Sequence, residues 1–173
     1  MKTKLSFLVL ALMAGMLLYQ CEKEKQAETV LSGKLLDYSD CKDFTKSATN
    51  AVTIADTLSC IQYQYDVEKN LLKVKHVNTG FNCCPGELYC SFSMISDTIV
   101  IKESEKSALC HCNCLFDMDI EITGVANRKY QVKVVEPYAE EMEKLVFEVD
   151  LAQEPEGSFC VTRKDYPWGE SLW

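Results

Sequence analysis

The chain has 173 residues, a formal net charge of −8 and ten cysteines. This length suits one domain with a sizeable core better than two full domains. The acidic balance, without a basic stripe, argues against nucleic-acid binding, so we expect no nucleic-acid partner. The cysteine content is too high for an ordinary reduced cytosolic protein and favours an exported protein in an oxidising compartment.

The N-terminus has the pattern of a secretory signal peptide. Lys2 and Lys4 give it a positive start, and residues 5–18 form an apolar core too short to span a bilayer as a mature helix. This core runs into Leu18-Tyr19-Gln20-Cys21, which resembles the lipobox of bacterial lipoproteins. That resemblance implies cleavage before Cys21 and a lipid on its thiol.

Gln20 departs from the lipobox pattern, in which a small residue precedes the cysteine. The alternative is ordinary cleavage, for instance after Ala14, which would leave a soluble protein. With Cys21 as the first mature residue, we expect a signal peptide over 1–20, a lipidated flexible tether over 21–28 and a single β-sandwich domain over 29–173. The charged residues 22–24 resemble signals that send some lipoproteins of Gram-negative anaerobes to the outer surface. We therefore expect an exported protein, lipid-anchored to the outer membrane, on its periplasmic or cell-surface face.

Beyond the tether, apolar and polar residues alternate with period two, and no long window shows a helical period. The expected strands are residues 30–37, 61–65, 72–76, 88–94, 98–103, 110–122, 130–134, 145–151 and 159–163. We expect turns at residues 66–70 and 96–97, and a break after the third strand at Asn78-Thr79-Gly80. About eight or nine short strands at this spacing predict an all-β fold, an antiparallel sandwich that is immunoglobulin-like or similar.

Three cysteines continue the apolar side of one predicted strand. Cys110, Cys112 and Cys114 share their parity with Phe116 and Met118. Neighbours at i and i+2 on a strand lie about 6.6–7 Å apart, at or beyond the reach of a disulfide. Each of the three cysteines should therefore seek a partner elsewhere in the chain.

The segment 83–90 offers three partners, Cys83, Cys84 and Cys90, so a three-on-three set of disulfides to 110–114 is the economical hypothesis. Which cysteine bonds which cannot be deduced from the sequence. Among Cys41, Cys60 and Cys160 one disulfide can form, and we favour Cys41 or Cys60 with Cys160, which leaves one thiol over. The disulfide candidates are thus Cys41, Cys60, Cys83, Cys84, Cys90, Cys110, Cys112, Cys114 and Cys160.

A metal site is the alternative interpretation of the same residues. Cys83, Cys84, Cys110, Cys112 and Cys114 resemble thiolate clusters that hold zinc or copper(I). Against it, paired zinc ligands usually have two or more residues between them, and exported thiols tend to oxidise. Thioredoxin-like chemistry lacks its Cys-x-x-Cys motif before a helix.

Other chemistry has little support in the sequence. His76 lies on the inward parity of its strand, and no hydrolase, metalloprotease, phosphate-loop or dinucleotide motif is present. An enzyme would need a pocket that brings His76 together with a carboxylate. We expect no enzyme, no cofactor and no metal in the favoured interpretation. Asp117, Asp119 and Glu121 are interpreted as a solvated strand face, and Tyr166–Trp173 as a tail packed over an open sheet edge.

Three motifs carry a resemblance that covers most of the mature chain: Asn82-Cys83-Cys84-Pro85, Cys112-Asn113-Cys114-Leu115-Phe116-Asp117 and Tyr166-Pro167-Trp168-Gly169. Together they resemble a group of small secreted bacterial lipoproteins of unassigned activity. The expectation is thus a non-enzymatic cell-envelope lipoprotein that binds another macromolecule or an envelope component. Its partners would be the membrane, through the lipid at Cys21, and that ligand. The alternative is a lipoprotein that binds zinc or copper through the cysteines of 83–90 and 110–114.

Overall fold

The computed structural model describes residues 28–42 and 54–164, which form ten strands in two sheets. The first sheet has the order β1 (Glu28–Val30), β5 (Leu88–Ile95), β6 (Thr98–Glu105), β8 (Lys129–Val135) and β9 (Val146–Asp150). The second has the order β10 (Glu156–Thr162), β3 (Leu58–Asp66), β4 (Leu71–Asn82), β7 (Asn113–Thr123) and β2 (Ser32–Tyr38).

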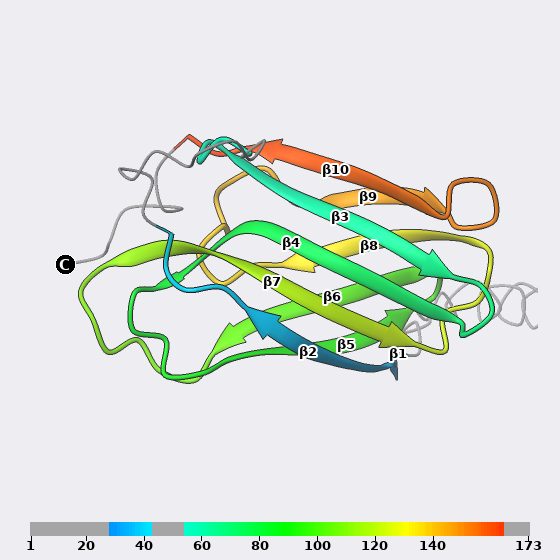
Figure 1. The fold of residues 1–173 in the computed structure, drawn as a ribbon, viewed down its shortest axis with the longest axis horizontal. Coiled ribbons are helices and arrows are strands. Elements are labelled where there is room, and N and C mark those ends of the chain that lie inside the picture. Colours follow the sequence, from blue (N-terminus) through cyan, green and yellow to red (C-terminus); the bar gives the residue numbers. More distant parts are fainter. Residues whose placement is uncertain (1–27, 43–53, 165–173) are drawn as a thin grey trace, which may run out of the picture.

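The two sheets lie one over the other, which confirms the predicted sandwich (Figure 1). Neighbouring strands are antiparallel except β6 and β8, which are parallel. This pair arises because the chain leaves β6, passes through β7 in the other sheet, and returns to β8 alongside β6. Within residues 28–42 and 54–164, no helix has the length and apolarity that crossing a bilayer requires.

Several predicted segments fall outside this description. The signal peptide 1–20, the lipidation site Cys21 and the terminal segment 166–173 belong to residues that the structure does not describe. Strand β1 begins at Glu28, which is the last residue of the predicted tether. The first strand therefore begins one residue before the predicted start of the domain at residue 29.

Alternation along the strands fills the space between the sheets with apolar side chains. Phe116, Met118 and Ile120 on β7 are at most 3% exposed, whereas Asp117 and Asp119 between them are half-buried. Aromatic rings extend the core toward the edge strands, where Phe147 of β9 stacks on Phe159 of β10 with ring centroids 4.8 Å apart. The period-two pattern therefore predicted which face of each strand is buried.

The predicted break at Asn78-Thr79-Gly80 is wrong, because β4 continues to Asn82. A bulge between Val77 and Thr79 takes up the irregularity, and Asn78 adopts a left-handed φ of 63°. Its side-chain amide donates to the carbonyl oxygens of Ala55 and Leu58, at 3.0 and 2.7 Å. Asparagine tolerates this φ better than most residues, so a turn-forming residue here produces a bulge instead of a strand end.

The predicted start of the cysteine-bearing strand at residue 110 is also wrong. Strand β7 begins at Asn113, whose partner Asn82 is the last residue of β4. Beyond Asn82 the chain turns through Pro85 and Gly86, which has a φ of 69°, so residues 110–112 have no strand beside them to continue the ladder. Cys110 and Cys112 therefore lie in a connection and not on a strand.

Strands β2 and β5 approach closely where Gly33 faces Phe92. A Cβ added at Gly33 would lie 2.7 Å from the Phe92 ring, which is closer than real Cβ contacts. Phe92 is 6% exposed and part of the core, so it has little room to move.

We predict that Gly33→Ala lowers the free energy of unfolding by about 1–3 kcal/mol through overpacking. Chemical denaturation of the oxidised protein measures this, with Ser32→Ala, the exposed neighbour on the same strand, as the control. Equal midpoints for Gly33→Ala and the wild type would show that the two sheets are not in contact at this point.

Candidate functional site

Two groups of side chains that could take part in binding or catalysis lie between or beside the sheets. We name the first the cysteine corner, which comprises Cys41, Cys83, Cys84, Cys110, Cys112 and Cys114. It is built on the connections after β4 and before β7, which lie at the left-hand end of the sandwich in Figure 1. We name the second the buried polar cluster, which comprises Ser59, His76, Thr79, Glu103, Glu136 and Arg163.

Two of the three predicted cross-links between 83–90 and 110–114 are present. Cys83 bonds Cys112 and Cys84 bonds Cys110, with Cα atoms 5.6 and 5.3 Å apart. Of the two predicted alternatives, Cys41 or Cys60 with Cys160, the structure has Cys60–Cys160, across the β3–β10 ladder where these residues are direct partners. These bonds join the two connections of the corner, and the beginning of the domain to its end.

The third predicted cross-link is wrong, because Cys114 bonds Cys41 and Cys90 forms no disulfide. Cys90 lies on β5 in the first sheet, whereas Cys114 lies on β7 in the second. The segment after β2 runs along the other side of β7, where the amide of Lys42 donates to the Leu115 carbonyl oxygen at 2.9 Å. That ladder places Cys41 beside Cys114, so the unpaired thiol is Cys90 and not one of Cys41, Cys60 and Cys160.

Cys90 has the environment of a structural thiol. It is half-buried and packs against the core opposite Glu103. Burial, and secondarily the charge of Glu103, raise the pKa of the Cys90 thiol well above its ordinary value. Because the thiolate is the reactive form, this thiol is a poor nucleophile and a poor ligand.

Asn82 holds the two connections of the cysteine corner together. Its side-chain oxygen accepts the amide protons of Cys84 and Cys110, at 2.9 and 3.0 Å, and its amide group donates to the Cys110 carbonyl oxygen at 2.6 Å. The residue is 3% exposed, and its own backbone amide donates to Glu105 at 3.0 Å. Sequence reasoning missed this role, although an asparagine directly before paired cysteines was its signal.

The sulfur atoms of the corner lie closer together than the disulfides alone require. The Sγ atoms of Cys41, Cys83 and Cys114 lie within 4.8 Å of one another, although they belong to two different disulfides. Of the five cysteines in the predicted metal set, this group contains Cys83 and Cys114, and it adds Cys41. Cys84 and Cys110 do not belong to the group.

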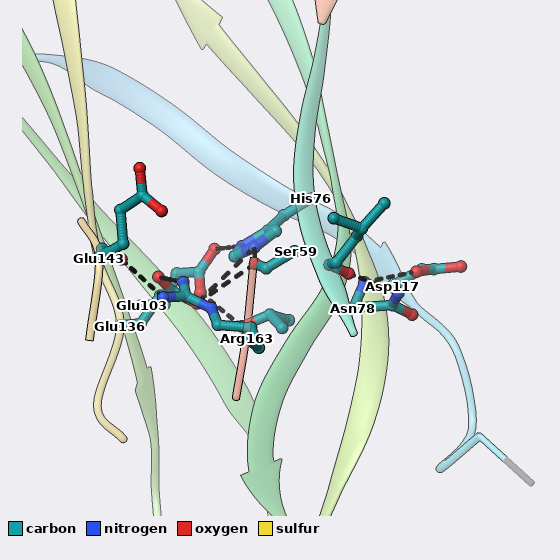
Figure 2. A network of polar contacts seen from close by, with 10 residues as sticks. Ser59, His76, Asn78, Glu103, Asp117, Glu136, Glu143 and Arg163 are labelled. Carbon is teal, nitrogen blue, oxygen red and sulfur yellow. Dashed lines mark hydrogen bonds and ion pairs between the residues drawn. The ribbon is translucent and has the colours of Figure 1, made fainter. Parts of the chain in front are cut away.

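The buried polar cluster is centred on His76 (Figure 2). Its Nδ1 lies 2.7 Å from Glu103 Oε1, and its Nε2 lies 2.8 Å from Ser59 Oγ. Thr79 donates to the other oxygen of Glu103 at 2.7 Å. The three side chains around the imidazole come from β3, β4 and β6, so the cluster bridges the two sheets.

An ion pair closes the other side of this cluster. Arg163 Nη2 donates to Glu136, and its Nη1 donates to the Glu143 carbonyl oxygen at 2.6 Å. Glu136 also lies 3.9 Å from His76 Nε2 and 3.5 Å from Ser59 Oγ. With His76 protonated, two positive and two negative charges balance in a site where an unpaired charge would be strongly destabilising.

The charge on His76 is favoured by these neighbours. Burial alone would lower the pKa of His76, but the charge and hydrogen bond of Glu103, with Glu136 further away, outweigh burial and the opposing Arg163. The net result is a pKa above the ordinary value of 6.5. Folding therefore favours the imidazolium form of His76 over the neutral imidazole.

Ser59, His76 and Glu103 follow the order of a nucleophile-activating triad, hydroxyl to imidazole to carboxylate. The structure thus does bring His76 together with a carboxylate. However, Ser59 and His76 are fully buried and Glu103 is 2% exposed, so a substrate does not reach the hydroxyl in this conformation. What the arrangement does here is to satisfy buried polar groups and join the sheets.

The sequence carried a signal for this cluster beyond His76. Five of its six members continue the inward parity of a strand: Ser59 precedes Ile61, His76 follows Val74, Glu103 follows Ile101, Glu136 follows Val134, and Arg163 follows Val161. The sixth, Thr79, follows the bulge in β4. A polar residue on an apolar face needs a partner. Alternation therefore indicated which polar residues are buried, although not which of them meet.

The acidic face of β7 is paired with lysines. Lys42 lies 2.6 Å from Asp117, Lys75 lies 3.4 Å from Asp119, and Lys34 lies 3.5 Å from Glu121. These pairs fit the interpretation of this face as a charged strand surface. Each carboxylate is paired with its own lysine, whereas a metal site would have the three carboxylates share one metal ion.

A groove of about 710 Å³ lies where β6, β8 and β9 meet the turns at their ends. The residues that line it are Ile95, Ser96, Asp97, Thr98, Lys129, Tyr130, Gln131, Glu148, Val149, Asp150, Gln153 and Glu154. Most of these side chains are polar or charged. The groove is therefore a surface for polar contacts and not an apolar cavity.

We predict that Asn82→Ala lowers the free energy of unfolding by about 2–4 kcal/mol, because two amide groups and a carbonyl oxygen lose their partner. Asn113→Ala, at the half-buried partner of Asn82 on β7, is the control. Urea denaturation of the oxidised variants measures the difference. An Asn82→Ala protein as stable as Asn113→Ala would show that these hydrogen bonds do not hold the corner.

The raised pKa of His76 predicts a pH dependence of stability. A raised pKa means that the folded state binds the proton more tightly, so its contribution is complete below pH 6.5 and is lost as pH rises through the folded pKa. The slope is at most about 1.4 kcal/mol per pH unit. Urea denaturation between about pH 5.5 and pH 9 measures it.

His76→Gln should remove this dependence, whereas His111→Gln should keep it. Persistence of the slope in His76→Gln would assign it to another group. A wild type that is more stable at the alkaline end would contradict the sign.

No family model, no curated protein and no solved structure shows a significant match to this chain. The cysteine corner and the buried polar cluster are therefore interpreted from their geometry alone.

Proposed function

We propose that this chain is an exported lipoprotein, tethered to the outer membrane through Cys21, whose domain is a non-catalytic binding or structural module of the cell envelope. Its ligand is another macromolecule or an envelope component. The lipid holds the sandwich at the membrane, and the disulfides keep it folded outside the cytoplasm.

The four disulfides are the observation that carries this proposal. Eight of the nine cysteines in the described residues are paired, and the ninth, Cys90, is half-buried in the core. Such bonds form and persist in oxidising compartments and are rare in reduced ones. In the sequence, Cys21 comes seven residues before Glu28, the first residue of β1, which leaves a short tether between the lipid and the domain.

The burial of the polar cluster supports the non-catalytic part of the proposal. The one hydroxyl–imidazole–carboxylate chain found among the described residues is closed off from solvent. The groove at β6, β8 and β9 is the surface that best fits a polar ligand. Its charges are partly balanced by the pairs Arg128–Asp97 and Lys129–Asp150, at 2.5 and 3.3 Å, so it offers hydrogen-bonding groups of both kinds.

We predict that Cys21→Ser abolishes lipid attachment, because serine lacks the thiol that would be modified. Expression in a Gram-negative host with a clickable fatty acid, followed by gel fluorescence and mass spectrometry, measures the lipid directly. Cys90→Ser is the matched control and should be labelled like the wild type. Equal labelling of Cys21→Ser and wild type, or a wild type without label, would overturn the anchoring part of the proposal.

A further inference from the structure

Two disulfides of the cysteine corner lie so close that three of their four sulfur atoms form one cluster. The Sγ atoms of Cys41, Cys83 and Cys114 are within 4.8 Å of one another. The fourth sulfur, that of Cys112, is bonded to Cys83. Nothing in a β-sandwich requires two cross-links to converge in this way, since either one alone would staple its own pair of segments.

The convergence follows from the order of the strands. The start of β7 lies between two neighbours, with β4 on one side and the continuation of β2 on the other. The amide of Cys83 donates to the Cys112 carbonyl oxygen at 2.8 Å, and the amide of Lys42 donates to that of Leu115 at 2.9 Å. The backbone therefore fixes one cysteine on each side of the pair Cys112 and Cys114.

These separations suit a thiolate metal site. Zinc binds four thiolates tetrahedrally with Zn–S distances of about 2.3 Å, which places the sulfurs roughly 3.8 Å from one another. Three of the sulfurs here are already within 4.8 Å, so small side-chain rotations would bring them into position. Thiolates select soft ions such as Zn²⁺, Cd²⁺ or Cu⁺ over Ca²⁺ and Mg²⁺.

We propose that reduction of the disulfides Cys41–Cys114 and Cys83–Cys112 converts this part of the corner into a binding site for one soft metal ion. The ligands are the thiolates of Cys41, Cys83, Cys112 and Cys114. This set differs from the one that sequence spacing suggests, because Cys41 takes the place of Cys84 and Cys110.

A dithiol can serve as the reductant for the two disulfides. Each protein disulfide gains two electrons and two protons and becomes two thiols, while the dithiol loses them and becomes a disulfide. Binding of a divalent ion then releases the four thiol protons. Cys41 and Cys112 are exposed residues, so each of the two disulfides can be approached from solvent.

Contacts other than these two bonds also hold the corner. They are the hydrogen bonds of Asn82 to Cys84 and Cys110 and the β4–β7 ladder up to Asn113. The metal would then replace two covalent links by one coordinate centre at the same place. The domain thus becomes a redox-gated metal binder, a property that goes beyond the proposed scaffold role.

Titration with Cd²⁺ tests the proposal, because cadmium thiolates absorb in the ultraviolet. The purified lipidated protein is compared before and after treatment with a phosphine reductant, with the bound metal counted by equilibrium dialysis. We expect one Cd²⁺ per chain in the reduced protein and none in the oxidised protein. No binding after reduction, or equal binding in both forms, would overturn the proposal.

Variants separate this site from the third disulfide. Cys84→Ser with Cys110→Ser should keep the one Cd²⁺, whereas Cys41→Ser or Cys112→Ser should weaken binding by roughly 10–100-fold or more. The opposite order would place the metal on the set that spacing suggests and contradict the proposal. If reduction unfolds the protein, added Cd²⁺ should restore the strand signal in circular dichroism, and failure to restore it counts against the site.

Discussion

Where the β4–β7 ladder ends, disulfides and the side chain of one buried asparagine hold the two segments together. Asn82 and Asn113 are the last partners of that ladder, and beyond them both segments continue as irregular connections. Without a further constraint, the backbone groups of these connections would lose their partners and the end of the sandwich would fray. Asn82 supplies hydrogen bonds and the adjoining disulfides supply covalent links, and together they hold the two irregular segments against each other.

The buried polar cluster solves a related problem between the sheets. Inward positions near the strand ends carry polar side chains, and a dry interface tolerates them only when charges and hydrogen bonds are matched. His76, Glu103, Glu136 and Arg163 supply this matching with two charges of each sign. The hydroxyl–imidazole–carboxylate arrangement would activate a nucleophile in an open cleft. Buried here, it links the two sheets.

The period of two in the sequence predicted the sandwich, nearly all of its strands and the buried face of each. Cysteine spacing also predicted that segments 83–90 and 110–114 are cross-linked, without the individual pairings, and that Cys41 or Cys60 bonds Cys160. It failed where pairing depends on which strands become neighbours. Cys41 reaches Cys114 because β2 lies beside β7, and Cys90 is excluded because β5 belongs to the other sheet. Strand order is set by the packing of the whole chain, so local spacing could not reveal it.

Disulfide mapping tests the central claim, that sulfur fixes this end of the domain, most directly. The protein is alkylated unreduced under denaturing conditions, digested and analysed by mass spectrometry. The account predicts Cys83–Cys112, Cys84–Cys110, Cys41–Cys114 and Cys60–Cys160, with Cys90 alkylated. Recovery of Cys83, Cys84, Cys110 and Cys112 as alkylated free thiols, or of Cys90 bonded to one of them, would contradict it.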